Sequence, residues 1–106
     1  MPQVPELKNA DIFGSTVPTL AFLTNRVSLQ SGRTLHLGRE RSNDIAVSDP
    51  HISRQHAVLR VLPDGNLYVA DYHSVNGLFC GDERVPYAVL RPGQEFLIGM
   101  IGFRFE

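Results

Sequence analysis

The 106-residue sequence contains one cysteine, one lysine and no tryptophan, and it has no long apolar run. A lone Cys80 cannot form an internal disulfide, which favours a reducing compartment. The longest mainly apolar stretch, residues 96–103, is interrupted by glycine and falls far short of the roughly 20 residues that a membrane helix needs. The first residues have neither a basic start nor an apolar segment, so we expect no signal peptide and a cytoplasmic location.

The basic charge of the chain comes almost wholly from arginine. Ten basic residues, of which Lys8 is the one lysine, face eleven acidic residues, and the net charge is −1. Such a balance lacks the concentrated positive field that gathers nucleic acid or an anionic membrane, so we expect neither as a partner. An anion must instead be recognised locally, and the planar guanidinium group of arginine suits that task.

Short apolar runs, separated by turn signals every eight to twelve residues, indicate an all-β sandwich or barrel of about ten short strands. The run from Ala57 to Val61 alternates with period two, which places one set of side chains in the core. No helical periodicity occurs. Residues 1–18, with three of the seven prolines, are predicted to be an N-terminal arm or linker, and residues 19–106 the domain.

Three predicted loops, at residues 38–44, 48–56 and 71–77, are dense in hydrogen-bonding groups. In a β-sandwich, the loops at one end lie close together on a rigid frame. If these three share an end, they bring together guanidinium groups, hydroxyls, an amide and backbone N–H groups. We therefore expect a site for a small, multiply charged oxyanion.

Short motifs in these loops and beyond them follow one another in a definite order and spacing. They are Gly38-Arg39, Asn43-Asp44-Ile45, Ser53-Arg54-Gln55-His56-Ala57, Asp71 with Ser74-Val75-Asn76-Gly77, and Leu90-Arg91-Pro92-Gly93 with Ile98-Gly99. Together they resemble the forkhead-associated (FHA) domain over residues 19–106. The resemblance implies a β-sandwich of about eleven short, mostly antiparallel strands in two sheets, without substantial helix. It also implies a module, part of a larger protein, that binds phosphothreonine in a partner or in another segment of its own protein, downstream of Ser/Thr kinases.

The resemblance also implies roles for individual residues. The phosphate would be bound by Arg39 and Ser53, with Arg54 as a second cation. The peptide backbone beside the phosphothreonine would be bound by Asn76. The loop architecture would be held by Gly38, His56, Ser74 and Gly77. No cofactor and no metal are implied.

Two positions depart from the family pattern, because Val75 and Leu78 stand where many members have threonine. A lost hydroxyl removes a donor worth roughly 0.5 to 1.5 kcal/mol. An alternative is therefore a degraded pocket that serves phosphate-independent docking or oligomerisation. On its own, Arg39 could also be a surface arginine paired with Glu40 or Asp44.

An enzyme would recruit Ser53, His56 and Asp71 as nucleophile, base and orienting group. The chain has no Gly-x-Ser-x-Gly motif and little length with which to enclose a substrate, so we predict that it is not an enzyme. The histidines and Cys80 lack the short spacings of metal ligands. The phenylalanines are expected in the core rather than on a stacking surface for nucleic acid; they include Phe79, Phe96, Phe103 and Phe105.

Overall fold

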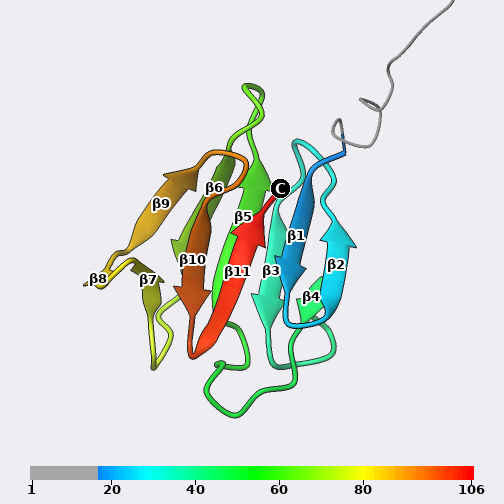
Figure 1. Cartoon of the computed structure of the whole chain (residues 1–106). Helices are drawn as coiled ribbons and strands as arrows, with labels where there is room; N and C mark the ends of the chain where they lie inside the picture. The colour runs from blue at the N-terminus through cyan, green and yellow to red at the C-terminus, as the bar shows by residue number, and fades with distance from the viewer. Residues whose placement is uncertain (1–16) are drawn as a thin grey trace, which may run out of the picture.

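The structure of the chain, a computed structural model, describes residues 17–106. The predicted arm over residues 1–18 lies almost entirely outside this range. The described residues form eleven strands and no helix, arranged as two layers (Figure 1). Neighbouring strands are antiparallel, except for one parallel pair. The predicted β-sandwich is confirmed. Residues 17–106 therefore contain no helix that could cross a membrane.

One sheet has six strands in the order β2-β1-β11-β10-β7-β8. Its strands are β1 (Thr19–Phe22), β2 (Asn25–Ser28), β7 (Leu78–Cys80), β8 (Glu83–Arg84), β10 (Glu95–Ile98) and β11 (Ile101–Phe105). A two-residue turn joins β7 to β8, with Gly81 at a φ of 62°. A positive φ at the first central residue is what a type II′ hairpin turn requires, as the Gly81-Asp82 pair predicted.

The other sheet has five strands in the order β4-β3-β5-β6-β9. Its strands are β3 (Leu35–Gly38), β4 (Ile45–Ala46), β5 (Ala57–Val61), β6 (Leu67–Asp71) and β9 (Tyr87–Leu90). The short β4 pairs with β3 in parallel, so the chain must loop back between them. That loop contains residues 39–44, the first of the three polar segments.

The core lies between the sheets, and alternation along the strands fills it. Every second residue of β5 and of β11 is buried. The ring of Phe103 on β11 lies 4.8 Å from that of Phe22 and 5.6 Å from that of Phe96, centroid to centroid. Burial of one phenyl side chain stabilises a fold by roughly 1.5 to 3 kcal/mol, so this cluster ties β1, β10 and β11 together.

The prediction that Phe79 belongs to the core with Phe96, Phe103 and Phe105 is only partly right. The other three are buried, but Phe79 is half-buried. Its neighbour Leu78 is fully buried, and alternation then turns Phe79 toward the outer face of the sheet. There it pairs with Leu97 and Arg84, which are both exposed.

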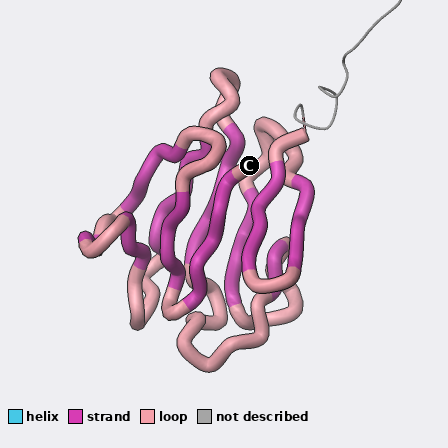
Figure 2. Tube along the Cα trace, in the orientation of Figure 1, coloured by secondary structure: helices cyan, strands magenta, loops and turns pink. Residues whose placement is uncertain are grey.

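Strand direction places the start of β1 and the end of β11 at the end of the sandwich opposite the polar loops. The loops that follow β3, β4 and β6 gather at the lower end of the sandwich in Figure 1, and the tube in Figure 2 shows them side by side. At the opposite end the first and last strands are bonded to each other. The Thr19 N–H donates to the Glu106 carbonyl at 3.1 Å, and the Glu106 N–H donates to the Thr19 carbonyl at 2.8 Å.

Candidate functional site

The polar loops after β3, β4 and β6 form one cluster, joined by hydrogen bonds between the loops. The loop after β3 bonds to the loop after β4 through backbone groups, and the loop after β4 bonds to the loop after β6 through side chains. The turn between β10 and β11 joins them, because the Gly99 N–H donates to the Gly77 carbonyl at 3.3 Å. The expected meeting of three loops at one end is therefore present in the structure.

Arg39 follows the last residue of β3, where the first two loops are in closest contact. A Cβ on Gly38 would lie 2.2 Å from the Arg54 carbonyl oxygen, so only glycine permits this approach. The Arg39 N–H donates to the Ser53 carbonyl and its Nε to the Ile52 carbonyl, each at 2.9 Å. The stem of the side chain is thus fixed at both ends.

The terminal amino groups of Arg39 have no carboxylate partner among residues 17–106. Asp44, one alternative partner, is bonded to Arg33 at 2.8 Å and accepts the His36 N–H at 2.8 Å. Glu40, the other, forms no ion pair within the described range. The surface pairing of Arg39 that the sequence left open is absent within residues 17–106, and the Arg39 side chain is exposed.

Ser53 lies in the loop after β4 and uses three of its polar groups to hold that loop. Its carbonyl accepts from Arg39, and its N–H donates to Nδ1 of His56 at 3.0 Å. Its Oγ accepts the Val75 N–H at 3.1 Å. Because the oxygen acts as an acceptor there, the hydroxyl hydrogen is left for another acceptor.

His56 is fully buried and links the second loop to the third. Its Nδ1 accepts a hydrogen bond from the Ser53 N–H. Its Nε2 lies 3.0 Å from the Gly77 carbonyl oxygen and donates to it. A single tautomer, with the hydrogen on Nε2, satisfies both contacts. The ring therefore acts as a rigid bridge between the backbones of the two loops.

The same contacts leave no catalytic triad in place. A triad needs the base hydrogen-bonded to the nucleophile's hydroxyl, but both ring nitrogens of His56 are bonded to backbone groups. The Asp71 carboxylate lies 3.9 Å from His56 Nε2 and is bonded to Ser74 instead. Ser53, His56 and Asp71 thus build loop structure in this arrangement.

The loop after β6 is a tight turn organised by Ser74 and Gly77. The hydroxyl of Ser74 donates to an Asp71 carboxylate oxygen, and its Oγ accepts the Gly77 N–H at 2.9 Å. Gly77 has a φ of 87°, a conformation that favours glycine. These bonds present Val75 and Asn76 at the tip of the turn, where both are exposed.

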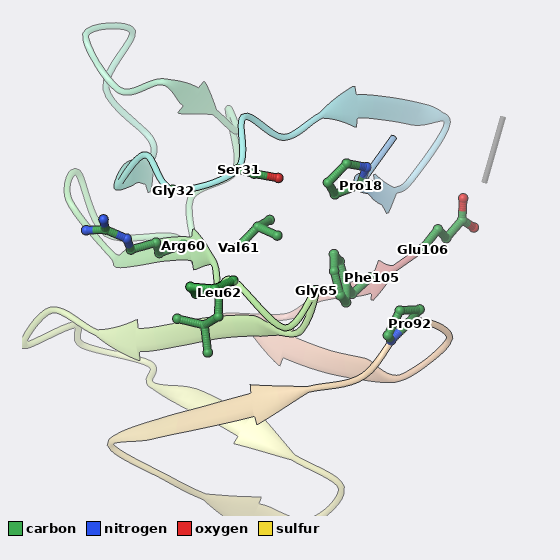
Figure 3. Close-up of a pocket in the computed structure, with 11 residues that line it drawn as sticks. Pro18, Ser31, Gly32, Arg60, Val61, Leu62, Gly65, Pro92, Phe105 and Glu106 are labelled. Carbon is green, nitrogen blue, oxygen red and sulfur yellow. The ribbon is translucent and has the colours of Figure 1, made fainter. Parts of the chain in front are cut away.

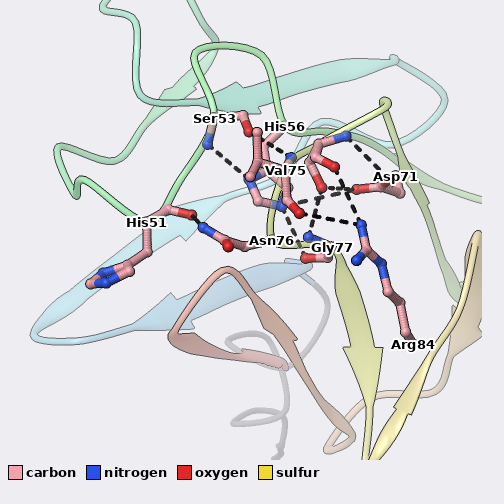
Figure 4. Close-up of polar contacts among 9 residues, drawn as sticks. His51, Ser53, His56, Asp71, Val75, Asn76, Gly77 and Arg84 are labelled. Atoms are coloured by element: carbon pink, nitrogen blue, oxygen red, sulfur yellow. Dashed lines mark hydrogen bonds and ion pairs between the residues drawn. The ribbon is translucent and has the colours of Figure 1, made fainter.

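Asn76 connects this tip to the loop after β4. Its Nδ2 donates to the His51 carbonyl at 2.7 Å (Figure 4). This bond uses one of the two amide hydrogens, so the other hydrogen and Oδ1 remain for a ligand. The amide group is therefore oriented by the protein while half of its bonding capacity stays open.

The second candidate cation, Arg54, contributes to the site through its backbone. Its carbonyl accepts from Nδ2 of Asn43 at 2.8 Å, and its exposed side chain has no carboxylate partner among the described residues. Asn43 also donates to the Glu40 carbonyl at 2.8 Å, so it bridges the first two loops. Asn43 belongs to one of the sequence motifs, but the motif did not predict that its side chain would link the two loops.

The other position that sequence reasoning missed is Arg84, on β8. Its Nη2 donates to the Ser74 carbonyl at 3.3 Å, although it lies in no motif. No sequence motif signals this contact, because it forms only when the β7–β8 hairpin folds back on the turn that precedes it.

A hollow of about 540 Å³ lies at the opposite end of the sandwich, away from all candidate site residues (Figure 3). Its lining combines residues at the start of β1 and the end of β11 with the β2–β3, β5–β6 and β9–β10 turns, and includes Pro18, Gly32, Gly65 and Glu106. It holds no cluster of convergent polar groups. The loop cluster, not this hollow, is therefore the candidate site.

No three His, Cys, Asp or Glu side chains within residues 17–106 come together in a way that would hold a metal ion. Cys80, on β7, is half-buried and unpaired within that range. Burial raises the pKa of its thiol, and the neighbouring Glu83 carboxylate raises it further.

We therefore expect Cys80 to react slowly with iodoacetamide at pH 8, because the thiolate is the reactive form. The rate should rise with pH around a midpoint higher than that of a cysteine in a short unstructured peptide, and Glu83→Gln should lower the midpoint by removing the adjacent charge. The measurement is the alkylation rate against pH. A midpoint equal to that of the peptide cysteine would contradict the prediction, whereas reduced access alone would slow the reaction without moving the midpoint.

A rigid sandwich with a polar site on the loops at one end is the architecture of a recognition module. The family model described as the FHA domain matches residues 35–99, more than half of the chain. The chain belongs to the FHA domain family. Domains of this family are binding modules rather than enzymes.

Two similar proteins come from mycobacteria. The chain is 37% identical over 71 residues to the ABC transporter ATP-binding/permease protein Rv1747 of Mycobacterium tuberculosis, covering 67% of this chain and 8% of that protein. It is 41% identical over 66 residues to the glycogen accumulation regulator GarA of Mycolicibacterium smegmatis, covering 62% and 41%. The match thus spans less than half the length of either relative.

Solved structures agree on the fold. The crystal structure of Rv1747 FHA-1 superposes with a TM-score of 0.76 at 30% identity, covering 85% of this chain and 94% of that chain. Mycobacterium tuberculosis EmbR, in complex with a low-affinity phosphopeptide, superposes with a TM-score of 0.74 at 28% identity, covering 85% and 24%.

Proposed function

We propose that the domain binds a phosphothreonine-containing segment through the loops after β3, β4 and β6. The observation that carries this proposal is the pairing of Arg39 with Ser53. Their backbones are bonded to each other, and each presents donors without a described partner: the terminal amino groups of Arg39 and the hydroxyl hydrogen of Ser53. We propose that these two sets of donors serve one phosphate group.

A phosphate is the ligand that suits this pair best. It carries about −1.5 to −2 charges and three strong acceptor oxygens. A guanidinium edge binds two such oxygens in a planar fork, and a serine hydroxyl binds a third. Arg54, exposed on the same loop as Ser53, adds a second cation to the proposal. Recognition by a few local donors agrees with a net charge of −1.

We assign to Asn76 the binding of the peptide backbone beside the phosphothreonine. Its half-used amide can donate to a peptide carbonyl and accept from a peptide N–H. The frame of the site is assigned to Gly38, His56, Ser74 and Gly77. Gly38 and His56 make contacts between loops, and Ser74 bonds to Gly77 within the loop after β6. A ligand would then meet donors that are already in place.

The relatives support this proposal. EmbR, which is 28% identical to this chain, is solved with a phosphopeptide. In this chain we propose an adaptor that performs no chemistry, acts in the cytoplasm as part of a larger protein, and recruits a partner or another segment of its own protein after a Ser/Thr kinase has acted.

The departures from the family pattern differ in their consequences. Val75 is 79% exposed at the tip of the turn, so the missing hydroxyl there removes one possible phosphate donor. Leu78 is fully buried in β7 and faces the core, away from the loops. Only one of the two substitutions thus touches the site, which leaves the degraded-pocket alternative with little support.

Titration of the domain with phosphothreonine, phosphoserine and unphosphorylated versions of the same peptides tests the proposal. We expect micromolar affinity for the best phosphothreonine peptides, about −7 to −9 kcal/mol, and none for the unphosphorylated ones. Burial of the threonine methyl adds about 0.8 kcal/mol, a few-fold preference over phosphoserine. Binding that persists without phosphate would favour the docking alternative and overturn the proposal.

A further inference from the structure

Arg84 reaches from β8 to the turn that carries Asn76 (Figure 4). Its Nη2 donates to the Ser74 carbonyl at 3.3 Å and lies 3.5 Å from the Val75 carbonyl. Its guanidinium group also packs directly on Gly77, where an added Cβ would lie 2.4 Å from Nε. Hydrogen bonding and packing therefore both place one cation against the 74–77 turn.

The contact continues through one peptide group to Ser53. The Ser74 carbonyl and the Val75 N–H belong to the same peptide group. The carbonyl accepts from Arg84, and the N–H donates to Ser53 Oγ at 3.1 Å. A cation at the oxygen of a peptide group polarises it and strengthens the hydrogen bond that its N–H donates. Arg84 thereby favours the arrangement in which the Ser53 oxygen is an acceptor.

We propose that Arg84 is a positioning residue of the phosphopeptide site, an inference that rests on the proposed function. It touches neither the phosphate nor the peptide. It holds the turn against the Ser53 loop, so that the Ser53 hydroxyl hydrogen and the Asn76 amide face the ligand together. The Arg84 guanidinium has no carboxylate partner among residues 17–106, so its charge acts on the carbonyls of Ser74 and Val75.

Arg84→Met tests this role, because methionine keeps much of the length and removes the donors. We expect phosphothreonine-peptide affinity to fall about three- to tenfold, and Arg84→Lys to recover part of the loss. Arg91→Met is the matched control. It removes the same charge from an exposed site on the β9–β10 turn, at the opposite end of the sandwich, and should leave the affinity unchanged.

A double-mutant cycle separates positioning from a general structural effect. If Arg84 acts through Ser53, Arg84→Met should weaken binding by less than about twofold once Ser53 is already alanine. A fall in stability alone would lower affinity equally in both backgrounds. Equal losses, or an unchanged affinity of the single variant, would overturn the proposal.

Amide hydrogen exchange of the ligand-free domain tests the positioning without any peptide. We expect the Val75 amide to exchange several-fold faster in Arg84→Met, while that of Leu59 in the core strand β5 is unchanged. Failure of the wild type to bind any phosphopeptide would overturn the proposed function, and the exchange rate of Val75 would still decide whether Arg84 orders the turn. An unchanged Val75 rate would show that it does not.

Discussion

Arg39→Ala is expected to lower phosphothreonine-peptide affinity about ten- to a hundredfold, because it removes the charge and the terminal donors assigned to the phosphate. Charge-assisted hydrogen bonds contribute roughly 1.5 to 3 kcal/mol each. A guanidinium edge can form two of them with one phosphate, whereas the Ser53 hydroxyl can donate only one. The backbone N–H of Arg39 still bonds to the Ser53 carbonyl in the variant, so the loops should stay together. Titration calorimetry measures the affinity of the variant, and a thermal unfolding curve measures whether its fold is retained.

Arg41→Ala is the matched control for this variant. Arg41 is an exposed arginine of the same loop, and its side chain forms no hydrogen bond or ion pair with another described residue. Its loss changes the net charge equally and should alter affinity by less than about twofold. Similar losses in the two variants would mean that the ligand senses only the general positive charge, and would remove Arg39 from the phosphate site.

Gly38→Ala is expected to destabilise the domain by about 2 to 3 kcal/mol and to weaken binding as well. The new Cβ would lie 2.2 Å from the Arg54 carbonyl oxygen and 2.9 Å from Asn43 Nδ2. The nearest of these atoms is backbone, so relief requires the first two loops to separate. That movement would displace Ser53 relative to Arg39. Denaturant unfolding gives the free energy of unfolding, and titration gives the affinity.

Gly102→Ala provides a comparison within a strand. Gly102 lies in β11 and has no positive φ, and a Cβ there would have only Leu97 Cδ2 near it, at 3.8 Å. We expect a change of less than about 0.5 kcal/mol in the free energy of unfolding. Equal destabilisation by both substitutions would show that the loss of glycine itself, rather than the contact between loops, is responsible.

The sequence predicted those parts of the molecule that depend on local pattern. Alternation in β5 and turn chemistry at Gly81 are properties of adjacent residues, so the two-sheet class and the β7–β8 hairpin were predictable. The order of motifs then identified Arg39 and Ser53 as candidates. What the sequence did not predict depends on tertiary packing. Phe79 faces outward because the packing of β7 buries its neighbour Leu78, and local alternation alone does not say which of the two is buried. Arg84 meets the 74–77 turn only after the β7–β8 hairpin has folded beside it.

The hydrogen bonds between Thr19 and Glu106 hold the first residue of β1 beside the residue that follows β11, at the end of the sandwich opposite the polar loops. Chain that flanks the domain on either side would therefore leave from one point, as from a single tether. Because that tether lies on the far side, swivelling about it changes the direction in which the site faces without covering the site. The same geometry suits the domain to insertion into a surface loop of a host protein, or to circular permutation by joining residues 19 and 106 and opening the exposed β5–β6 turn.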